Sequence, residues 1–72
     1  MSLNERLKAL RQEKGLSQEQ VARELSVSLS AYQRLEREGS TPNYANFLHL
    51  ADFFDVSMDY LAGRTDVREI GR

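Results

Sequence analysis

The sequence predicts a small all-α domain made of five short helices. Five Ser or Asn residues each stand directly before an apolar run with helical spacing, the position that an N-cap occupies. Two of them, Ser2 and Ser17, are followed three residues later by Glu5 and Gln20, which is the capping-box pattern. No stretch predicts a strand convincingly. The fold class therefore follows from local signals that agree along the chain.

The first helix is expected to begin after Ser2 and to end at Gly15. Its apolar face is formed by Leu3, Leu7 and Leu10. The second helix is expected to begin after Ser17. Leu16 before that cap and Val21 within the helix have the spacing of a hydrophobic staple, which fixes how the chain enters the helix.

The third helix is expected to begin after Ser28, with Val27 and Tyr32 as its staple pair and with Tyr32 and Leu35 facing inward. The caps Ser17 and Ser28 lie eleven positions apart, so two short helices are joined by a tight turn. This arrangement predicts a helix-turn-helix at about residues 17–37. The second helix of such a pair is shaped to lie in the major groove of DNA.

Residues 38–42 break the helical pattern, and Asn43 is the best cap for a fourth helix. The apolar face of that helix is formed by Phe47, Leu50, Ala51 and Phe54. A fifth helix is expected from the cap Ser57 to Leu61, with Gly63 ending it. We therefore expect one domain over residues 1–65 and a short flexible tail over residues 66–72.

Composition limits the classes of protein that the chain can represent. Its 72 residues contain no Cys, so no disulfide or thiolate metal site can stabilise the fold. No apolar run approaches the roughly 20 residues of a membrane span, and the first residues show no secretory signal. The net charge of −1 argues mildly against nucleic-acid binding, but residues 1–37 carry a net +2 and residues 38–72 a net −3. The basic half contains the expected helix-turn-helix.

Three segments together resemble the Cro / lambda-repressor-like family of helix-turn-helix proteins, also called XRE-type. They are Gly15-Leu16-Ser17-Gln18-Glu19-Gln20-Val21-Ala22, then Val27-Ser28 with Tyr32-Gln33-Arg34-Leu35-Glu36, and then Pro42 with Leu50-Ala51-Asp52-Phe53-Phe54-Asp55-Val56-Ser57-Met58-Asp59-Tyr60-Leu61. Single elements are weak, but the ordered set over roughly residues 3 to 65 is specific. The resemblance implies a DNA-binding domain from a bacterial or phage protein of the cytoplasm.

The resemblance also implies roles for particular residues. Candidates for contacts with base edges lie on the first two turns of the third helix: Leu29, Ser30, Ala31, Gln33 and Arg34. Candidates for phosphate contacts are Ser17, Gln18 and Arg37, and Arg6, Lys8, Lys14 and Arg23 are weaker ones that are more often plain surface. Alternatives remain at several positions, and Arg37 equally suits the role of a favourable cation at the C-terminus of the third helix. Leu29 can instead pack at the domain edge, and Arg34 can instead pair with Glu38 four residues later.

In the same family an Arg of the first helix commonly pairs with a Glu near the end of the third, and Arg11 and Glu36 match those positions. The chain also departs from the family pattern. Ser26 stands where Gly is usual, at a turn position that often needs a positive φ at a cost of about 1 kcal/mol. Glu38 replaces another usual Gly, with Gly39 one position later. Ser40 and Thr41 are neutral where Lys or Arg is common.

Taken together, the expected function is sequence-specific binding of double-stranded DNA at a palindromic operator by a transcriptional regulator, most simply a repressor, that acts as a homodimer. The candidates for the dimer face are Phe53, Met58, Tyr60 and Leu61. Phe53 is expected to be the exposed aromatic, because adjacent helical residues cannot both face one core. The alternative is a protein-interaction module, such as an antitoxin or an adaptor.

An enzyme is not expected. His49 is the only His, and there is no Cys nucleophile, no Gly-rich phosphate loop and no spaced set of metal ligands. We therefore expect no cofactor, no metal, no membrane partner and no small-molecule ligand.

Overall fold

The computed structural model describes residues 1–68, and five α-helices account for the secondary structure of that range. They are α1 (Leu3–Glu13), α2 (Gln18–Leu25), α3 (Leu29–Leu35), α4 (Tyr44–Phe53) and α5 (Met58–Leu61). The prediction of an all-α fold with five short helices is confirmed. No helix in this part of the chain has the length and apolar character needed to cross a membrane.

All five predicted N-caps are present. Ser2, Ser17, Ser28, Asn43 and Ser57 each accept a hydrogen bond from the backbone N–H three residues later. The capping boxes of Ser2 and Ser17 are both complete. The side chains of Glu5 and Gln20 accept hydrogen bonds from the backbone N–H groups of Ser2 and Ser17. Each such cap stabilises a short helix by about 1 kcal/mol.

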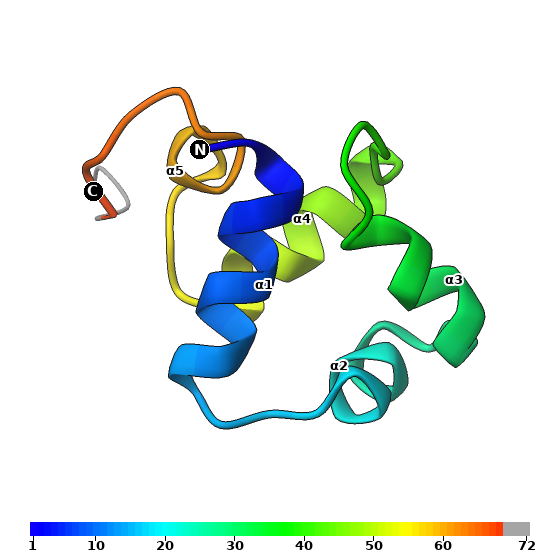
Figure 1. The fold of residues 1–72 in the computed structure, drawn as a ribbon. Helices are drawn as coiled ribbons and strands as arrows, with labels where there is room; N and C mark the ends of the chain where they lie inside the picture. The colour runs from blue at the N-terminus through cyan, green and yellow to red at the C-terminus, as the bar shows by residue number, and fades with distance from the viewer. Residues whose placement is uncertain (69–72) are drawn as a thin grey trace.

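The helices surround one apolar core, with α2 packed against α3 and α4, and α5 packed against α1 and α4. The core is formed by Leu7, Leu10, Val21, Ala22, Leu25, Tyr32, Leu50, Ala51, Phe54, Val56 and Leu61. Figure 1 shows α2 and α3 together at one end of the molecule, and α5 beside the start of α1 at the other. The helix-turn-helix therefore lies away from the N-terminus.

The turn between α2 and α3 contains a strained residue. Ser26 has φ 58° and ψ 39°, in the left-handed region that favours glycine. The turn closes with the Val27 N–H donating to the carbonyl of Ala22 at 3.0 Å. The positive φ expected at this position is thus present, and serine adopts it. Gly39, with φ 89°, has the left-handed conformation one residue after the usual glycine position.

The segment after α5 returns along α1. Gly63 lies so close to the carbonyl of Met1 that a Cβ atom would overlap it. The backbone N–H of Ser57 donates to the carbonyl of Arg68 at 2.9 Å, and the Arg68 guanidinium donates twice to Glu13, at 2.7 Å each. Residues 66–68 of the expected tail therefore contact the domain, and residues 69–72 lie outside the described residues.

We expect Ser26→Gly to stabilise the domain by about 1 kcal/mol, because glycine adopts the left-handed conformation without a Cβ clash. The melting temperature should rise by roughly 4–8 °C in a domain of this size. Ser26→Ala is the matched control, since alanine keeps the strain, and it should give no such rise. An equal rise with alanine would mean that the serine hydroxyl, not the backbone, is unfavourable there.

Candidate nucleic-acid interface

Helix α3 divides into a buried and an exposed side as the sequence predicted. The Tyr32 side chain is fully buried and Leu35 is half-buried against the core. On the other side, Leu29 is 41% exposed. Ser30, Arg34 and Arg37 are exposed, and Ala31 and Gln33 are half-buried. Leu29, Ser30 and Arg34 thus lie on the open side of a short helix, and Ala31 and Gln33 lie at its edges.

Arg34 makes no ion pair and no side-chain hydrogen bond within residues 1–68. The alternative of an i,i+4 pair with Glu38 is absent there, because the Glu38 carboxylate instead accepts from the Ser2 hydroxyl at 3.0 Å. Arg37 is likewise without a side-chain partner in this part of the chain. Two guanidinium groups on the open side of α3 are therefore available to a ligand.

The N-terminus of α2 offers free backbone donors close to α3. Ser17 Oγ accepts from the Gln20 N–H at 3.1 Å, and Gln20 Oε1 accepts from the Ser17 N–H at 2.7 Å. The N–H groups of Gln18 and Glu19, in the first turn, have no acceptor within the helix. Such a helix end favours an anion such as a phosphate.

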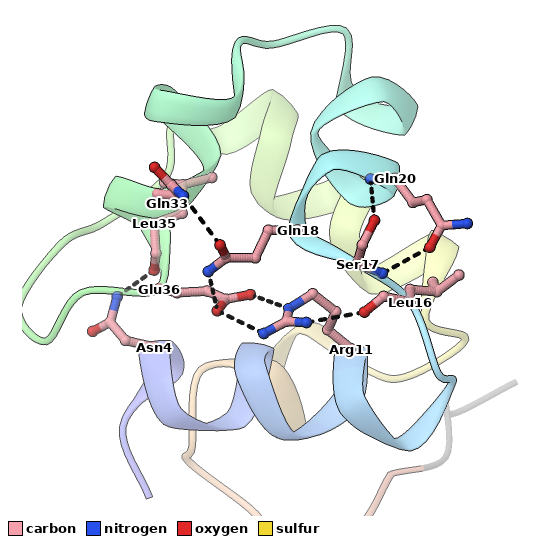
Figure 2. A network of polar contacts seen from close by, with 9 residues as sticks. All are labelled: Asn4, Arg11, Leu16, Ser17, Gln18, Gln20, Gln33, Leu35 and Glu36. Atoms are coloured by element: carbon pink, nitrogen blue, oxygen red, sulfur yellow. Dashed lines mark hydrogen bonds and ion pairs between the residues drawn. The ribbon is translucent and has the colours of Figure 1, made fainter.

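A polar network joins α1, α2 and α3 beneath this surface (Figure 2). Arg11 Nε donates to Glu36 Oε2 at 2.6 Å, and Arg11 Nη2 donates to Glu36 Oε1 at 3.2 Å. The third guanidinium nitrogen, Nη1, donates to the Leu16 carbonyl at 2.9 Å. The side chains of Arg11 and Glu36 are only 12% and 5% exposed. The ion pair expected from the resemblance is thus present, and it is a bidentate contact whose side chains are largely buried.

The same network includes the two glutamines expected at the interface. Gln18 Nε2 donates to Glu36 Oε1 at 3.0 Å, and Gln33 Nε2 donates to Gln18 Oε1 at 3.2 Å. Figure 2 shows Gln18 lying between Gln33 and Glu36. Gln18 is therefore attached to the protein on both sides of its amide, which orients it before any ligand binds.

Electrostatics favour the charged form of the Arg11–Glu36 pair. Burial raises the pKa of Glu36, but hydrogen bonds from Arg11 and Gln18 outweigh that effect and hold the pKa below its usual value. The hydrogen bond to Glu36 raises the pKa of Arg11. Glu36 is consequently a carboxylate at neutral pH and can only accept hydrogen bonds.

Two of the weaker phosphate candidates have partners within the domain. Arg6, a weaker phosphate candidate, is 6% exposed, lies 4.0 Å from the centre of the Tyr60 ring and donates to the Thr65 carbonyl at 3.1 Å. It is therefore not available to a phosphate. Arg23 pairs with Glu19 at 3.1 Å on the surface of α2.

The expected dimer face is corrected at one position. Leu61 is fully buried in the core, so it cannot contact a second copy. The guanidinium carbons of Arg6 and Arg68 lie 4.0 and 5.4 Å from the centre of the Tyr60 ring, which is half-buried. Phe53 is half-buried rather than exposed, because its ring packs edge-on against Phe54 with 5.0 Å between centroids.

An open hollow of about 340 Å³ remains between α4 and α5. Met58 and the 39% exposed Leu48 provide much of its apolar lining, and Asp52 and Asp59 line it as well. Of the four dimer candidates, Phe53, Met58 and Tyr60 thus retain accessible surface. Leu48 was not singled out from the sequence, since an apolar residue in an apolar helix gives no signal of exposure.

Asn4 is a site residue that the sequence did not indicate. It is 3% exposed, and its Nδ2 donates to the carbonyls of Leu35 and Ser40 at 2.6 and 2.9 Å. Its Oδ1 accepts from the Gly39 N–H at 3.0 Å. One side chain of α1 therefore holds the loop that follows α3. Asn4 lies more than thirty residues from these partners in the sequence, so no local pattern predicts the contact.

Comparison with known proteins gives consistent matches. The family model described as helix-turn-helix matches residues 7–61. The HTH-type transcriptional regulator ImmR of Bacillus subtilis is 36% identical over 67 residues, covering 93% of this chain and 53% of the relative. The cryptic phage CTXphi transcriptional repressor RstR of Vibrio cholerae is 34% identical over 64 residues, covering 89% and 57%.

A third relative, the HTH-type transcriptional activator BcrR of Enterococcus faecalis, is 39% identical over 61 residues, covering 85% of this chain and 30% of the relative. The chain thus spans about half the length of ImmR and RstR and less of BcrR.

We expect Arg11→Ala to destabilise the domain by about 3 kcal/mol, because it leaves the Glu36 carboxylate buried without its cation. The melting temperature should fall by roughly 12–24 °C. Arg23→Ala is the matched control, since its pair with Glu19 is exposed, and it should cost less than about 0.5 kcal/mol. Equal, small losses in both variants would show that the Arg11 pair adds no more than a surface contact.

Proposed function

This chain belongs to the XRE-type helix-turn-helix family, and on that premise we propose that it binds double-stranded DNA in a sequence-specific manner and regulates transcription. The relatives named as transcriptional regulators support the proposal. Membership of a family of DNA-binding regulators is also the reason to regard the protein as no enzyme. The proposal assigns the protein to the bacterial cytoplasm, where the operator DNA lies.

The observation that carries the proposal is the unpaired Arg34 on the open side of α3. Arginine binds O6 and N7 of guanine through two parallel hydrogen bonds in the major groove. Ser30 lies one turn earlier on the same side, and its neighbour Leu29 is suited to a thymine methyl group. Helix α3 is rigidly attached to α1 through Glu36, so these side chains are presented in a defined orientation.

Phosphate contacts set the register of the domain on DNA but carry no base preference. In our proposal they come from the exposed N-terminus of α2, at Ser17 and Gln18, and from Arg37 after α3. The loop of Ser40 and Thr41 adds no positive charge. We therefore expect weak nonspecific binding, so that base contacts provide most of the discrimination.

We further propose a two-fold dimer on a palindromic operator, with half-sites roughly 34 Å apart. Met58, Phe53 and the neighbouring Leu48 provide the accessible apolar surface for it. Repression is the simplest outcome, because a domain that occupies its operator blocks access to the promoter. Activation would need a further contact with another protein.

A protein-interaction module remains the second candidate. The acidic side chains Asp52 and Asp59 beside the apolar hollow favour it, because they match a cationic partner surface. The two candidates differ in their response to salt. DNA binding releases counterions and weakens steeply with salt, whereas the affinity of a protein module for DNA would be negligible at any salt concentration.

Selection from a random pool of double-stranded DNA, followed by sequencing, tests the proposal. An enriched motif with two-fold symmetry would support a dimeric regulator and reveal its operator. No enrichment at low salt, with protein shown to be folded by circular dichroism, would contradict the proposal in favour of the interaction module.

We expect Arg34→Ala to weaken binding to the selected site by about 1–3 kcal/mol and to relax the preference at one base pair. Arg64→Ala, which changes an exposed arginine after α5, is the control and should leave the preference intact. The measurement is a titration of every single-base variant of the site. A uniform loss on all variants would instead make Arg34 a phosphate contact.

We expect Met58→Glu to weaken dimerisation, because it places a charge in the apolar surface next to Asp59. Sedimentation equilibrium gives the monomer–dimer constant, and thermal melting confirms that the variant folds. Tyr44→Glu, at a position 71% exposed on α4, is the control away from the hollow. A constant that does not change in the Met58 variant would remove this face from the proposal.

A further inference from the structure

We infer that residues 65–68, which follow α5, form a regulatory strap whose closure on α1 sets the affinity of the interface on α3. When the strap is closed, it holds α1 from the side opposite to α3. When the strap is released, α1 loses that support and α3 is presented less well to its ligand. The inference rests on the proposed DNA binding and adds a point of control to it, because a binding event that draws the strap off α1 lowers the affinity for DNA.

The last residue of the strap connects α1 to α5. The Arg68 guanidinium donates twice to the Glu13 carboxylate at the end of α1, at 2.7 Å each, and once to the Tyr60 hydroxyl of α5 at 3.1 Å. The backbone carbonyl of Arg68 accepts from the N–H of Ser57, the cap of α5, at 2.9 Å. One residue therefore contacts two helices that are far apart in the sequence.

The contacts of the closed strap are reversible. The side chains of Arg68 and Glu13 are 48% and 52% exposed, so water and salt compete for this pair. The buried Arg6 guanidinium donates to the Thr65 carbonyl at 3.1 Å, but it lies 3.5 Å from the fully exposed Asp66 carboxylate. Its Nε has no acceptor within residues 1–68. Release of the strap returns this guanidinium to water, which offsets part of the contacts that are lost.

Helix α1 carries the partners of the strap and the partners of α3 on opposite sides. Arg6 and Glu13, which hold the strap, lie seven residues apart on one stripe of the helix. Asn4 and Arg11 lie seven residues apart on another stripe, and they hold the loop after α3 and Glu36. At about 100° per residue, the two stripes are roughly 160° apart around the helix axis. Figure 1 shows α1 between the segment after α5 and α3.

This arrangement couples the strap to α3 through one rigid element. Helix α1 has 11 residues and moves as a unit, so a displacement on the strap side also displaces Asn4 and Arg11. Asn4 accepts from the Gly39 N–H at 3.0 Å, and Arg11 donates to Glu36 at 2.6 Å. Both contacts fix the C-terminal end of α3, whose seven residues are too few for a stable isolated helix.

Hydrogen exchange of backbone amides tests the coupling in the free protein. The Ser57 N–H donates to the strap, the Gly39 N–H donates to α1, and the Val27 N–H, which donates within the helix-turn-helix, is the control amide. Arg68→Glu places a carboxylate against Glu13 and so releases the strap. We expect exchange to become about fivefold faster or more at Ser57 and Gly39 and to stay unchanged at Val27.

Binding to the selected operator tests the effect on affinity. Arg64→Glu is the matched control, because it makes the same change of charge at an exposed arginine just before the strap. We expect Arg68→Glu to weaken binding about fivefold more than Arg64→Glu does. The reversed pair, Glu13→Arg with Arg68→Glu, keeps the wild-type net charge and restores an ion pair. Its affinity and its exchange at Ser57 should return to within about twofold of the wild-type values. Circular dichroism checks that each variant folds.

Equal losses of affinity in Arg68→Glu and Arg64→Glu would overturn the inference and leave the proposed function intact. Faster exchange at Ser57 with no change at Gly39 would overturn it as well, because the strap would then open without affecting the hold of α1 on the loop after α3. Failure of the folded wild-type protein to enrich any DNA motif would instead overturn the proposed function, and the control of DNA affinity with it. Exchange at Gly39 would still decide whether the strap and α3 are coupled.

Discussion

The fold and the interface both depend on the buried ion pair between Arg11 and Glu36. It connects the last turn of α1 to the residue after α3, and the same guanidinium binds the Leu16 carbonyl in the link to α2. A helix of seven residues is too short to be stable by its own propensity. The orientation of α3 is therefore set by this pair and by the burial of Tyr32. The pair also supplies the charge that orients Gln18.

Because the core is small, local contributions such as helix caps matter for the stability of the domain. Helices of four to eleven residues surround one cluster of apolar side chains, and no cysteine adds a covalent link. Five side-chain caps offset the cost of forming so many helix ends. The strained turn at Ser26 opposes them. Such a domain gains its stability from many contributions of about 1 kcal/mol, so the loss of one large interaction has a correspondingly large effect.

The arginines of the described part of the chain fall into two groups, those with partners inside the domain and those without. Arg6, Arg11 and Arg68 hold segments of the domain together through carbonyls, carboxylates or the Tyr60 ring. Arg34, Arg37 and Arg64 have no such contacts there, and of these three Arg34 and Arg37 lie close together, on α3 and just after it. This division, more than the net charge of −1, identifies the cationic surface offered to a ligand. A chain without overall positive charge can still present a local one.

The sequence by itself determined the five helices and their caps, because a capping bond such as that of Ser28 spans only three residues and depends on local chemistry. It also indicated the open side of α3 through helical spacing. Only the tertiary structure decided that Leu61 is buried, that Arg6 lies under Tyr60 and that Asn4 holds the loop after α3. These contacts join segments far apart in the chain, and packing, not local pattern, decides which of them meet.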